Sequence, residues 1–224
     1  LLDLLSDRAD LVHEVGVIKK KEGLQIYAPE REDALLKRLA KMNKGRLPDD
    51  SIVAIYREIM SAALALEDNL TVAYLGPEGT WTHQAAIKKF GHSIAYSSQP
   101  NFAEVFDQVA RRRAHYGVVP IENSTEGAVS HTLDLFVDSH LQICAQILLR
   151  IDHCLLSSID RAEIKTLYSH PQVFGQCRNW ILRNFPDADL VEVSSTTKAA
   201  QLAHENAASG AAALGGKLAA ELNG

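Results

Sequence analysis

The stretch that decides the fold reads Gly117-Val118-Val119-Pro120-Ile121-Glu122-Asn123-Ser124-Thr125-Glu126-Gly127. Its first part belongs to a short apolar run at residues 116–119, which is typical of a strand that the proline then ends. We expect a helix over residues 127–137, because apolar residues recur there at helical spacing: Val129, Leu133, Phe136 and Val137. A strand that ends in polar residues at a helix N-terminus collects free backbone N–H groups at one point, which suits an anionic ligand.

Strand and helix patterns alternate along the whole of residues 71–224. Short apolar runs predict strands at residues 71–75, 93–96, 116–119, 165–168, 190–193 and 211–214. Amphipathic patterns predict helices at residues 80–90, 101–113, 127–137, 171–184, 196–207 and from 216 onward. This alternation predicts an α/β domain with mostly parallel strands. The long extended stretch at residues 141–156 is interpreted as the crossing between lobe one (about 71–152) and lobe two (about 153–224).

Polar residues gather at four of the predicted strand-to-helix turns. These turns are Gly79-Thr80, Glu122-Asn123-Ser124, Ser169-His170-Pro171-Gln172 and Ser194-Ser195-Thr196-Thr197. In open α/β sheets, ligands bind at the carboxyl ends of the strands. A single Ser or Thr at such a turn is typical of an ordinary helix N-cap, but four turns with amide side chains in two of them favour a shared cleft. The run at residues 111–113, three arginines, is expected to close a helix against its dipole.

Residues 1–69 carry helical patterns and no strand pattern. Along the first helix, apolar residues recur at steps of three and four: Leu1, Leu4, Leu5, Leu11, Val12, Val15 and Ile18. A second helix is predicted to begin near Pro29, a favoured first-turn residue, and to end near residues 43–45. A third is predicted from a cap signal at residues 48–51 to about Leu66. We therefore expect an all-helical domain in front of the α/β domain.

Two cations, Arg8 and Lys19, fall within the apolar stripe of the first helix. A helix turns by about 100° per residue, so both side chains lie on one face, roughly 16 Å apart along the axis. Burying them is costly unless an anionic group meets them, whereas long side chains at the edge of a stripe can also reach solvent. The residues alone leave both interpretations open. Glu67, beside the stripe of the third helix, is by itself typical of a solvated helix end.

Bulk composition excludes several classes of partner. The 224 residues contain 23 Lys and Arg against 28 Asp and Glu, a net charge of −5, which argues against nucleic acid or an anionic membrane as a partner. No apolar run reaches the roughly 18 residues of a membrane span. The scattered Cys144, Cys154 and Cys177 predict buried, reduced thiols of a cytoplasmic protein and neither a disulfide nor a metal site. Because the chain starts inside a helical pattern without Met, we expect a fragment that lacks both ends.

The helical part combines Arg8, Glu14-Val15-Gly16, Lys19, Pro29-Glu30-Arg31-Glu32, Glu58-Ile59-Met60-Ser61 and Leu66-Glu67. This pattern resembles the all-helical chorismate mutases, above all those fused in front of prephenate dehydratase. The resemblance implies a homodimer of three-helix chains in which the long first helix is shared between two active sites. An intramolecular rearrangement needs no cofactor, because holding the compact conformer and stabilising charge on the breaking ether bond can supply the acceleration.

The same resemblance assigns roles to five residues. It implies that Arg8 and Arg31 hold the carboxylates of chorismate, that Lys19 donates to the ether oxygen, and that Glu32 accepts the ring hydroxyl. Glu67 matches a position that hydrogen-bonds the same ether oxygen, where many members have Gln. Two positions depart from some members, which have polar residues where this chain has Ala28 and Ala63. A further arginine, supplied by the partner chain in that family, precedes the start of this sequence.

The α/β part contains Gly76-Pro77-Glu78-Gly79-Thr80-Trp81-Thr82, an intact Pro120–Gly127 motif, Ser169–Trp180, and Ser195-Thr196 followed by Ala199-Ala200. These ordered motifs resemble the prephenate dehydratases over the whole stretch. The resemblance implies a two-lobed fold like the type II periplasmic binding proteins, with prephenate in the cleft. The residues it places in that cleft are Thr80, Asn123, Ser124, Gln172 and Ser195. The family's Thr-Arg-Phe segment and its phenylalanine-sensing ACT domain are absent from this sequence.

The combined resemblance predicts a bifunctional enzyme of phenylalanine biosynthesis, which converts chorismate to prephenate and then to phenylpyruvate, without cofactor or metal. Two alternatives stay open from the residues. One is a dehydratase whose helical domain only dimerises, and the other is a clamshell module that only binds a small molecule. The simultaneous presence of Arg8, Lys19, Arg31 and Glu32 weighs against the first alternative.

Overall fold

The computed structural model describes residues 1–23, 28–67, 69–123 and 127–223. Its contacts divide the chain into two compact units. The first unit contains Leu1–Tyr74, Ala86–Ser97 and Phe102–Ile147, and the second contains Leu75–Ala85, Ser98–Asn101 and Leu148–Gly224. The domain and lobe limits expected from the sequence, at residues 69–71 and 152–153, remain predictions.

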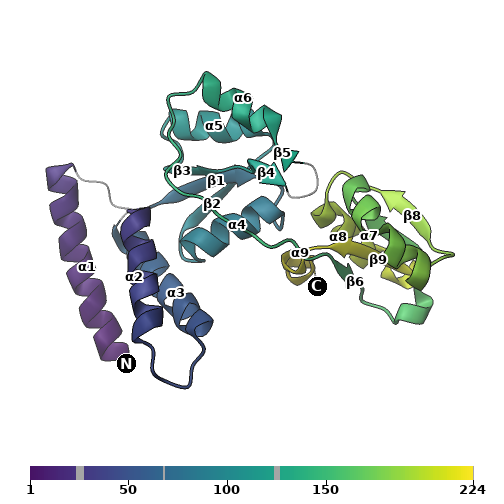
Figure 1. The fold of residues 1–224 in the computed structure, drawn as a ribbon, viewed down its shortest axis with the longest axis horizontal. Coiled ribbons are helices and arrows are strands. Elements are labelled where there is room, and N and C mark those ends of the chain that lie inside the picture. The colour runs from purple at the N-terminus through teal and green to yellow at the C-terminus, as the bar shows by residue number, and fades with distance from the viewer. Residues whose placement is uncertain (24–27, 68, 124–126, 224) are drawn as a thin grey trace. The chain divides into compact units, whose positions relative to one another are not determined.

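The N-terminal part of the first unit is helical, as predicted. It consists of α1 (Leu2–Glu22), α2 (Pro29–Met42) and α3 (Asp49–Glu67), and both α1 and α2 pack against α3 (Figure 1). Helix α2 starts at Pro29, because the fixed φ of proline suits the first helical turn. Helix α1 ends before Gly23, whose φ of 66° gives the left-handed conformation of a helix C-cap. Leu36 of α2 and Met60 and Leu64 of α3 are buried.

The apolar stripe predicted for α1 is largely exposed in this chain. Leu4, Leu11, Val15 and Ile18 keep 70%, 63%, 46% and 52% of their surface accessible. Four large apolar side chains along one helix form a larger exposed patch than single surface hydrophobic residues do, and such patches mark interaction surfaces.

A three-stranded sheet forms the rest of the first unit's core. Its strands are β1 (Thr71–Leu75), β2 (Ala95–Gln99) and β3 (Tyr116–Val118), in the order β2-β1-β3 with β1 parallel to β3. Helices α4 (Trp81–Phe90) and α5 (Phe102–Ala110) follow β1 and β2. The middle of the central strand β1, residues 72–74, is buried because both faces of the strand are covered, and Ala73 packs with Val105 of α5. The strand predicted at residues 93–96 corresponds to β2, which begins two residues later, at Ala95.

The decisive stretch folds differently from the prediction beyond β3. Residues on either side of its turn pair as β4 (Glu122–Asn123) and β5 (Gly127–Ala128), a small antiparallel ladder. Helix α6 (Ser130–Val137) begins only after this ladder, and its N-cap Val129 provides no side-chain cap. The expectation that the polar turn opens the helix is therefore wrong. Its physical reason is the hydrogen bond from Val129 N to Ile121 O at 3.0 Å, which closes a hairpin before the helix starts.

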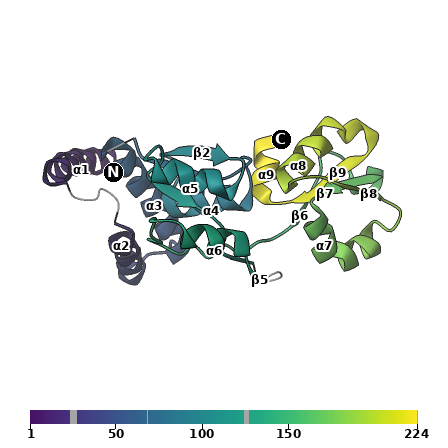
Figure 2. The same cartoon turned by 90° about the horizontal axis from the view of Figure 1, so that it is seen from above.

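The run of three arginines is also placed differently from the expectation. Helix α5 ends at Ala110. Arg112 has a φ of 57°, a left-handed conformation that cannot be part of a right-handed helix. The arginines therefore follow the helix instead of closing its last turn. Arg111 still reaches back one turn, with Nε 2.6 Å from Oδ1 of Asp107. Helix α6 lies beside α5 (Figures 1 and 2). The rings of Phe136 and Phe106 meet between these helices, with centroids 4.8 Å apart.

The second unit contains a four-stranded sheet. Its strands are β6 (Cys154–Leu156), β7 (Thr166–Ser169), β8 (Asp189–Glu192) and β9 (Ala211–Gly215), in the order β6-β9-β7-β8. Strand β7 is parallel to β8 and β9, whereas β6 is antiparallel to β9. The predicted alternation of strands and helices with mostly parallel pairing is confirmed here. The long stretch before β6, residues 139–153, contains no helix or strand.

The helices of this unit cover both faces of its sheet. Helices α7 (Pro171–Asn184) and α8 (Thr196–Glu205) lie on opposite faces (Figure 2), and α9 (Lys217–Asn223) follows β9. Successive strand residues point to opposite faces. Accordingly Ala212 and Leu214 pack with α7, whereas Ala213 packs with Ala199 and Ala203 of α8. The small alanines let α8 approach the sheet closely. Short 3-10 turns occupy Arg161–Glu163 and Ala207–Ser209.

The cysteines are free, as predicted, but two of them are not buried. Cys144 and Cys154 are exposed and Cys177 is half-buried. Cys144 lies in the irregular stretch and Cys154 on the edge strand β6, and neither position is covered as a central strand would be. Among the helices that the structure describes, none has the length and apolar character that crossing a membrane requires.

Candidate functional site

Lys19 and Glu67 meet between α1 and α3. Nζ of Lys19 lies 3.1 Å from Oε2 of Glu67, and the two side chains keep 19% and 7% of their surface accessible. Gly16, one turn before Lys19, explains this approach, because a Cβ there would lie 2.9 Å from Cγ of Glu67. Glu67 therefore does not lie in solvent at the end of its helix. The sequence analysis assigned no role to Gly16, although a glycine inside a helix signals close backbone packing.

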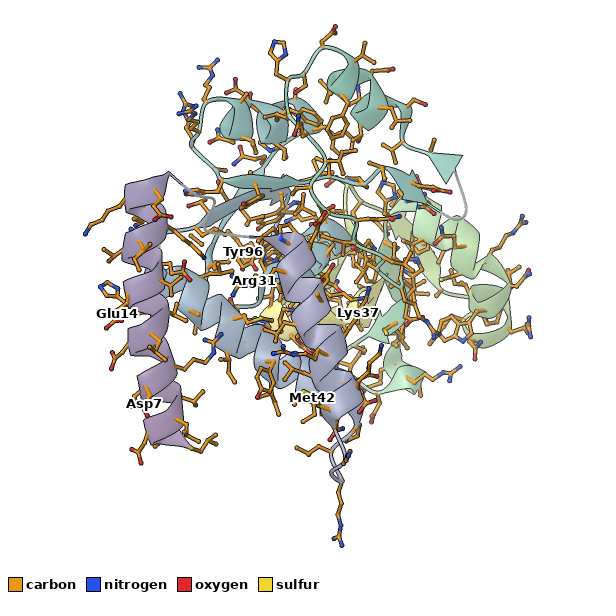
Figure 3. All side chains as sticks on the ribbon, turned by 60° about the vertical axis from the view of Figure 1, so that its left-hand side comes forward. Asp7, Glu14, Arg31, Lys37, Met42 and Tyr96 are labelled. Atoms are coloured by element: carbon orange, nitrogen blue, oxygen red, sulfur yellow. The ribbon has the colours of Figure 1, made fainter. Side chains whose placement is uncertain are left out.

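The two arginines predicted for carboxylate binding are not engaged with other described residues. Arg8 is half-buried on α1, and Arg31 lies exposed on the first turn of α2 (Figure 3). Neither makes an ion pair within the described ranges of the chain. A guanidinium group offers a planar pair of donors that matches a carboxylate. Both arginines are therefore chemically suited to an anionic ligand.

Glu32 is buried and already has a partner, Arg57 of α3. The Arg57 guanidinium donates to Oε1 of Glu32 and to the main-chain oxygen of Lys89, the latter at 2.7 Å. Burial raises the pKa of Glu32, and the positive charges of Arg57 and Lys89 oppose this rise. Arg57 is not among the site residues predicted from the sequence. The signal that points to it is a cation on the packed side of α3, one turn before the buried Ser61.

Thr80 lies in the turn between β1 and α4, and its hydroxyl supports that turn. Oγ1 donates to the main-chain oxygen of Leu75 at 2.9 Å. The neighbouring Gly79 N donates to Nδ1 of the buried His83 at 3.1 Å. These local bonds fix the backbone of residues 75–83, so that the first turn of α4 is held in a defined orientation.

Two glycines bring the Thr80 turn close to the start of α8 and α9 within the second unit. A Cβ on Gly79, which has a φ of 81°, would lie 3.2 Å from Oγ1 of Thr197. A Cβ on Gly216 would lie 2.7 Å from the Trp81 ring and 2.8 Å from Nε2 of Gln84. The Thr80 and Ser195 turns therefore lie close together within the second unit. A shared binding site at these turns stays a prediction.

Ser195 and Gln172 lie at the carboxyl edge of the parallel strands β8 and β7. Ser195 is the N-cap of α8, and its side chain accepts a hydrogen bond from Lys198 N at 3.0 Å, the ordinary role of such a serine. Gln172 is the second residue of α7. Helices that follow adjacent parallel strands start at the same edge of the sheet, so the two turns share that edge.

Asn123 belongs to the first unit, where it pairs with Gly127 in the β4–β5 ladder. Ser124, also predicted to contact prephenate, lies outside the described residues. A cleft that includes these two residues together with Thr80, Gln172 and Ser195 stays a prediction.

Three polar atoms of the second unit are buried without a hydrogen-bond partner among the described residues: Nε2 of Gln84, Nδ1 of His153 and Oγ1 of Thr197. The other ring nitrogen of His153 lies 2.7 Å from Oε1 of Gln176, and the ring packs edge-on against Trp81 with centroids 5.6 Å apart. Leaving a buried polar atom unsatisfied costs about 1–3 kcal/mol, so native structures normally supply a water or ligand. The sequence analysis gave these three residues no role.

No cluster of three or more His, Cys, Asp or Glu side chains suited to a metal occurs in the part of the chain that the structure describes. The candidate residues of the helical part and those of the α/β part suit different kinds of ligand binding. The helical part offers cations and a buried carboxylate, which suit an anionic ligand that also carries a hydroxyl group. The α/β part offers helix N-termini, hydroxyls and amides, which bind an anion without a formal positive charge.

Comparison with known proteins assigns relatives to both parts. The family model described as prephenate dehydratase matches residues 72–224, and the model described as chorismate mutase type II matches residues 1–68. A curated relative is the bifunctional chorismate mutase/prephenate dehydratase of Neisseria gonorrhoeae, 45% identical over 226 residues. The alignment covers 100% of this chain and 62% of that protein, so the chain spans less than two thirds of the length of this relative.

Solved structures resemble the α/β part. The prephenate dehydratase from Arthrobacter aurescens, determined in complex with L-Phe, is 30% identical with a TM-score of 0.56, over 68% of this chain and 52% of that one. A second structure, GqqA, described as a novel type of quorum quenching acylase, is 26% identical with a TM-score of 0.61, over 68% of this chain and 56% of that one.

Proposed function

The chain belongs to the prephenate dehydratase family, and from this premise we propose that it is part of a bifunctional enzyme of phenylalanine biosynthesis. Its helical part rearranges chorismate to prephenate, and its α/β part dehydrates and decarboxylates prephenate to phenylpyruvate. The matches to a chorismate mutase model and a prephenate dehydratase model along one chain support this assignment. Both reactions proceed without cofactor or metal.

In the mutase reaction, Arg8 and Arg31 hold the two carboxylates of chorismate, and Glu32 accepts the hydrogen of the ring hydroxyl. Lys19 and Glu67 both face the ether oxygen, on which negative charge develops as the bond breaks. A donor oriented in advance toward that oxygen stabilises the transition state more than the ground state. The single observation that supports this best is the 3.1 Å contact between Lys19 and Glu67, which joins two residues of different helices.

In the dehydratase reaction, Thr80, Asn123, Ser124, Gln172 and Ser195 bind prephenate together with the N-termini of α4, α7 and α8. Departure of the hydroxyl with a proton and loss of carbon dioxide create an aromatic ring, so an oriented hydrogen-bond donor suffices. Neutral donors do not hold the departing carboxylate as tightly as an arginine would. The buried unpaired atoms of Gln84, His153 and Thr197 support this site, because they lie in the same unit as Thr80 and Ser195 and lack partners among the described residues.

The helical part also forms a homodimer through α1, and the enzyme works in the cytoplasm. The exposed apolar residues of α1, of which Leu4 and Leu11 are 70% and 63% accessible, support the dimer. Pairing α1 with a second copy removes these side chains from water. Sedimentation of the full-length protein tests this directly, because Leu4→Glu with Leu11→Glu is expected to shift the dimer to a monomer.

The experiment that tests the function is an assay of the purified full-length protein with chorismate and, separately, with prephenate. We expect prephenate from the first substrate and phenylpyruvate from the second. Turnover of prephenate alone would reduce the helical part to a dimerisation element. Binding of prephenate without turnover would leave a binding module and contradict the proposal for the α/β part.

A further inference from the structure

Helix α3 is joined to the end of α4 by a row of hydrogen bonds. Ser93 N donates to Oγ of Ser61 at 3.1 Å, and His92 N donates to Oε2 of Glu58 at 3.0 Å. Arg57 donates to the oxygen of Lys89 at 2.7 Å. Residues Arg57, Glu58 and Ser61 are neighbours on α3, so one face of this helix receives the whole segment 89–93.

Two backbone groups at the end of α4, the amide of Ser93 and the oxygen of Lys89, form hydrogen bonds with α3 instead of with each other. If α4 continued, the amide of Ser93 would donate to the oxygen of Lys89. Instead, Ser61 of α3 accepts from that amide and Arg57 of α3 donates to that oxygen. Helix α3 therefore satisfies the backbone groups that the end of α4 leaves open.

A close backbone contact at Gly91 and an ion pair of Lys89 also join α4 to the neighbouring helices. Gly91 has a φ of 77°, and a Cβ there would lie 2.5 Å from Cβ of Ser61, so only glycine fits. The side chain of Lys89 is 8% exposed, and its Nζ lies 2.9 Å from Oδ1 of Asp33, the residue after Glu32. Helix α4 thus contacts α2 as well as α3.

Arg57 links this junction to the candidate chorismate site. Its guanidinium donates both to the oxygen of Lys89 and to Oε1 of Glu32, whose side chain is 8% exposed. Within the described ranges, Oε2 of Glu32 has no hydrogen-bond partner and is left for a ligand hydroxyl. A buried carboxylate that is held on one oxygen presents the other in a defined direction.

We propose that Arg57 is a positioning residue for Glu32, held in place by the last turn of α4, so that a segment matched to the dehydratase family supports the chorismate site. This inference rests on the proposed mutase function. It adds that the helical part does not orient its own catalytic carboxylate alone.

The same geometry predicts a change in the pH dependence of chorismate turnover. The charged groups that face Glu32 are Arg57 from α3, Lys89 from α4 and Asp33 on its own helix. Burial raises the pKa of Glu32, and Arg57 is the largest influence that opposes this rise. Without Arg57 the pKa of Glu32 rises further. The pH below which chorismate turnover falls, through protonation of Glu32, then moves upward.

The test compares Arg57→Gln, Glu32→Gln, the double variant and a control, Arg38→Gln, in the full-length protein. Arg38 is an exposed arginine of α2. We expect Arg57→Gln to lower kcat/KM for chorismate by about 10- to 100-fold, the scale of a misplaced reacting group, and to move the acidic limb to higher pH. The double variant is expected to match Glu32→Gln alone, because Arg57 acts through Glu32. Arg38→Gln is expected to behave as the wild type.

Failure of this inference and of the proposed function can be told apart. Unchanged chorismate turnover in Glu32→Gln would remove Glu32 from the proposed site. A full effect of Glu32→Gln with wild-type turnover in Arg57→Gln would overturn the positioning role alone, as would effects that simply multiply in the double variant. Thermal unfolding of every variant, together with Arg57→Lys, which keeps the charge, separates misfolding from misplacement.

The contribution of α4 is tested by Ser61→Ala, which removes the acceptor of the Ser93 amide. A smaller fall in chorismate turnover, with the acidic limb moved in the same direction as in Arg57→Gln, supports the role of the α4 end. Wild-type turnover and pH profile in Ser61→Ala would show that Arg57 holds Glu32 without help from α4.

Discussion

The helical part and the α/β part place their candidate site residues by different means. In the helices these residues are charged and meet across long sequence separations, as Lys19 and Glu67 do. In the α/β part they are neutral, and Thr80 and Ser195 each support the backbone of their own turn. The candidate chorismate site therefore depends on how the helices pack, whereas the candidate prephenate residues depend more on the geometry of their own turns.

The energetic consequences differ as well. Removing one partner of a buried ion pair leaves an uncompensated charge and costs about 3–5 kcal/mol, so the paired residues of the helical part are sensitive to substitution. Removing an N-cap side chain costs about 1 kcal/mol. A variant of the α/β turns is therefore expected to fold and to report on binding and chemistry.

The largest effect is expected from Lys19→Ala. It removes the cation that faces both Glu67 and the ether oxygen, so kcat for chorismate is expected to fall by about 100-fold or more. Prephenate turnover is expected to stay unchanged. The matched control is Lys21→Ala, an exposed lysine in the last turn of the same helix. A near-normal chorismate rate in Lys19→Ala would show that the helical site does not depend on this charged residue.

Substituting the neutral candidate residues tests the proposed prephenate site of the α/β part. Asn123→Ala and Gln172→Ala are each expected to lower prephenate turnover by about 10- to 100-fold, the scale of one lost oriented donor, and to spare chorismate turnover. Gln201→Ala, an exposed amide on α8, is the control. If a folded variant lost both activities together, the two sites would not be separate.

Glu67→Gln tests whether the side chain at position 67 must donate a hydrogen bond in the helical site. A carboxyl donates a hydrogen bond only when it carries its proton, whereas an amide always donates. Only the carboxyl can lose its proton, so the pH dependence of chorismate turnover is expected to differ between the wild type and Glu67→Gln. Glu67→Gln is expected to hold its rate at alkaline pH. Superimposable pH–rate profiles of the two proteins would remove Glu67 from the site.

The smallest effect is expected from His92→Ala, at the junction of α3 with residues 89–93. Burial disfavours the charge of Glu58, but hydrogen bonds from the His92 ring and backbone outweigh it and lower the pKa of Glu58. A lowered pKa means that the contact stabilises the fold at neutral pH and that this stability is lost as pH falls through that pKa. The pair is exposed, so the expected loss is at most about 1 kcal/mol.

Chemical unfolding at several pH values checks this prediction. The difference between His92→Ala and the wild type is expected to shrink on acidification. His204→Ala, an exposed histidine on α8, is the control. A difference that grows as the pH falls would mean that Glu58 is not the partner through which His92 acts.

Sequence reasoning succeeded where the signal is local. Helices α2 and α7 begin at Pro29 and Pro171, since proline suits the first turn of a helix. It placed the start of α6 too early, at residue 127, whereas this helix begins at Ser130, after Val129 N has bonded to the oxygen of Ile121. It also placed Cys144 and Cys154 inside, because residue type alone does not say which strand lies at an edge.

The order and type of most elements, the helical part before the α/β part, and the candidate residues for a charged ligand could all be predicted from the sequence. These properties follow from periodicity and turn chemistry within a few residues of one another. Only the tertiary structure decided that Lys19 meets Glu67, that Glu32 is held by Arg57, and that Gly79 and Gly216 bring two turns together. Those contacts join residues far apart in the chain, and they depend on which helix faces become buried.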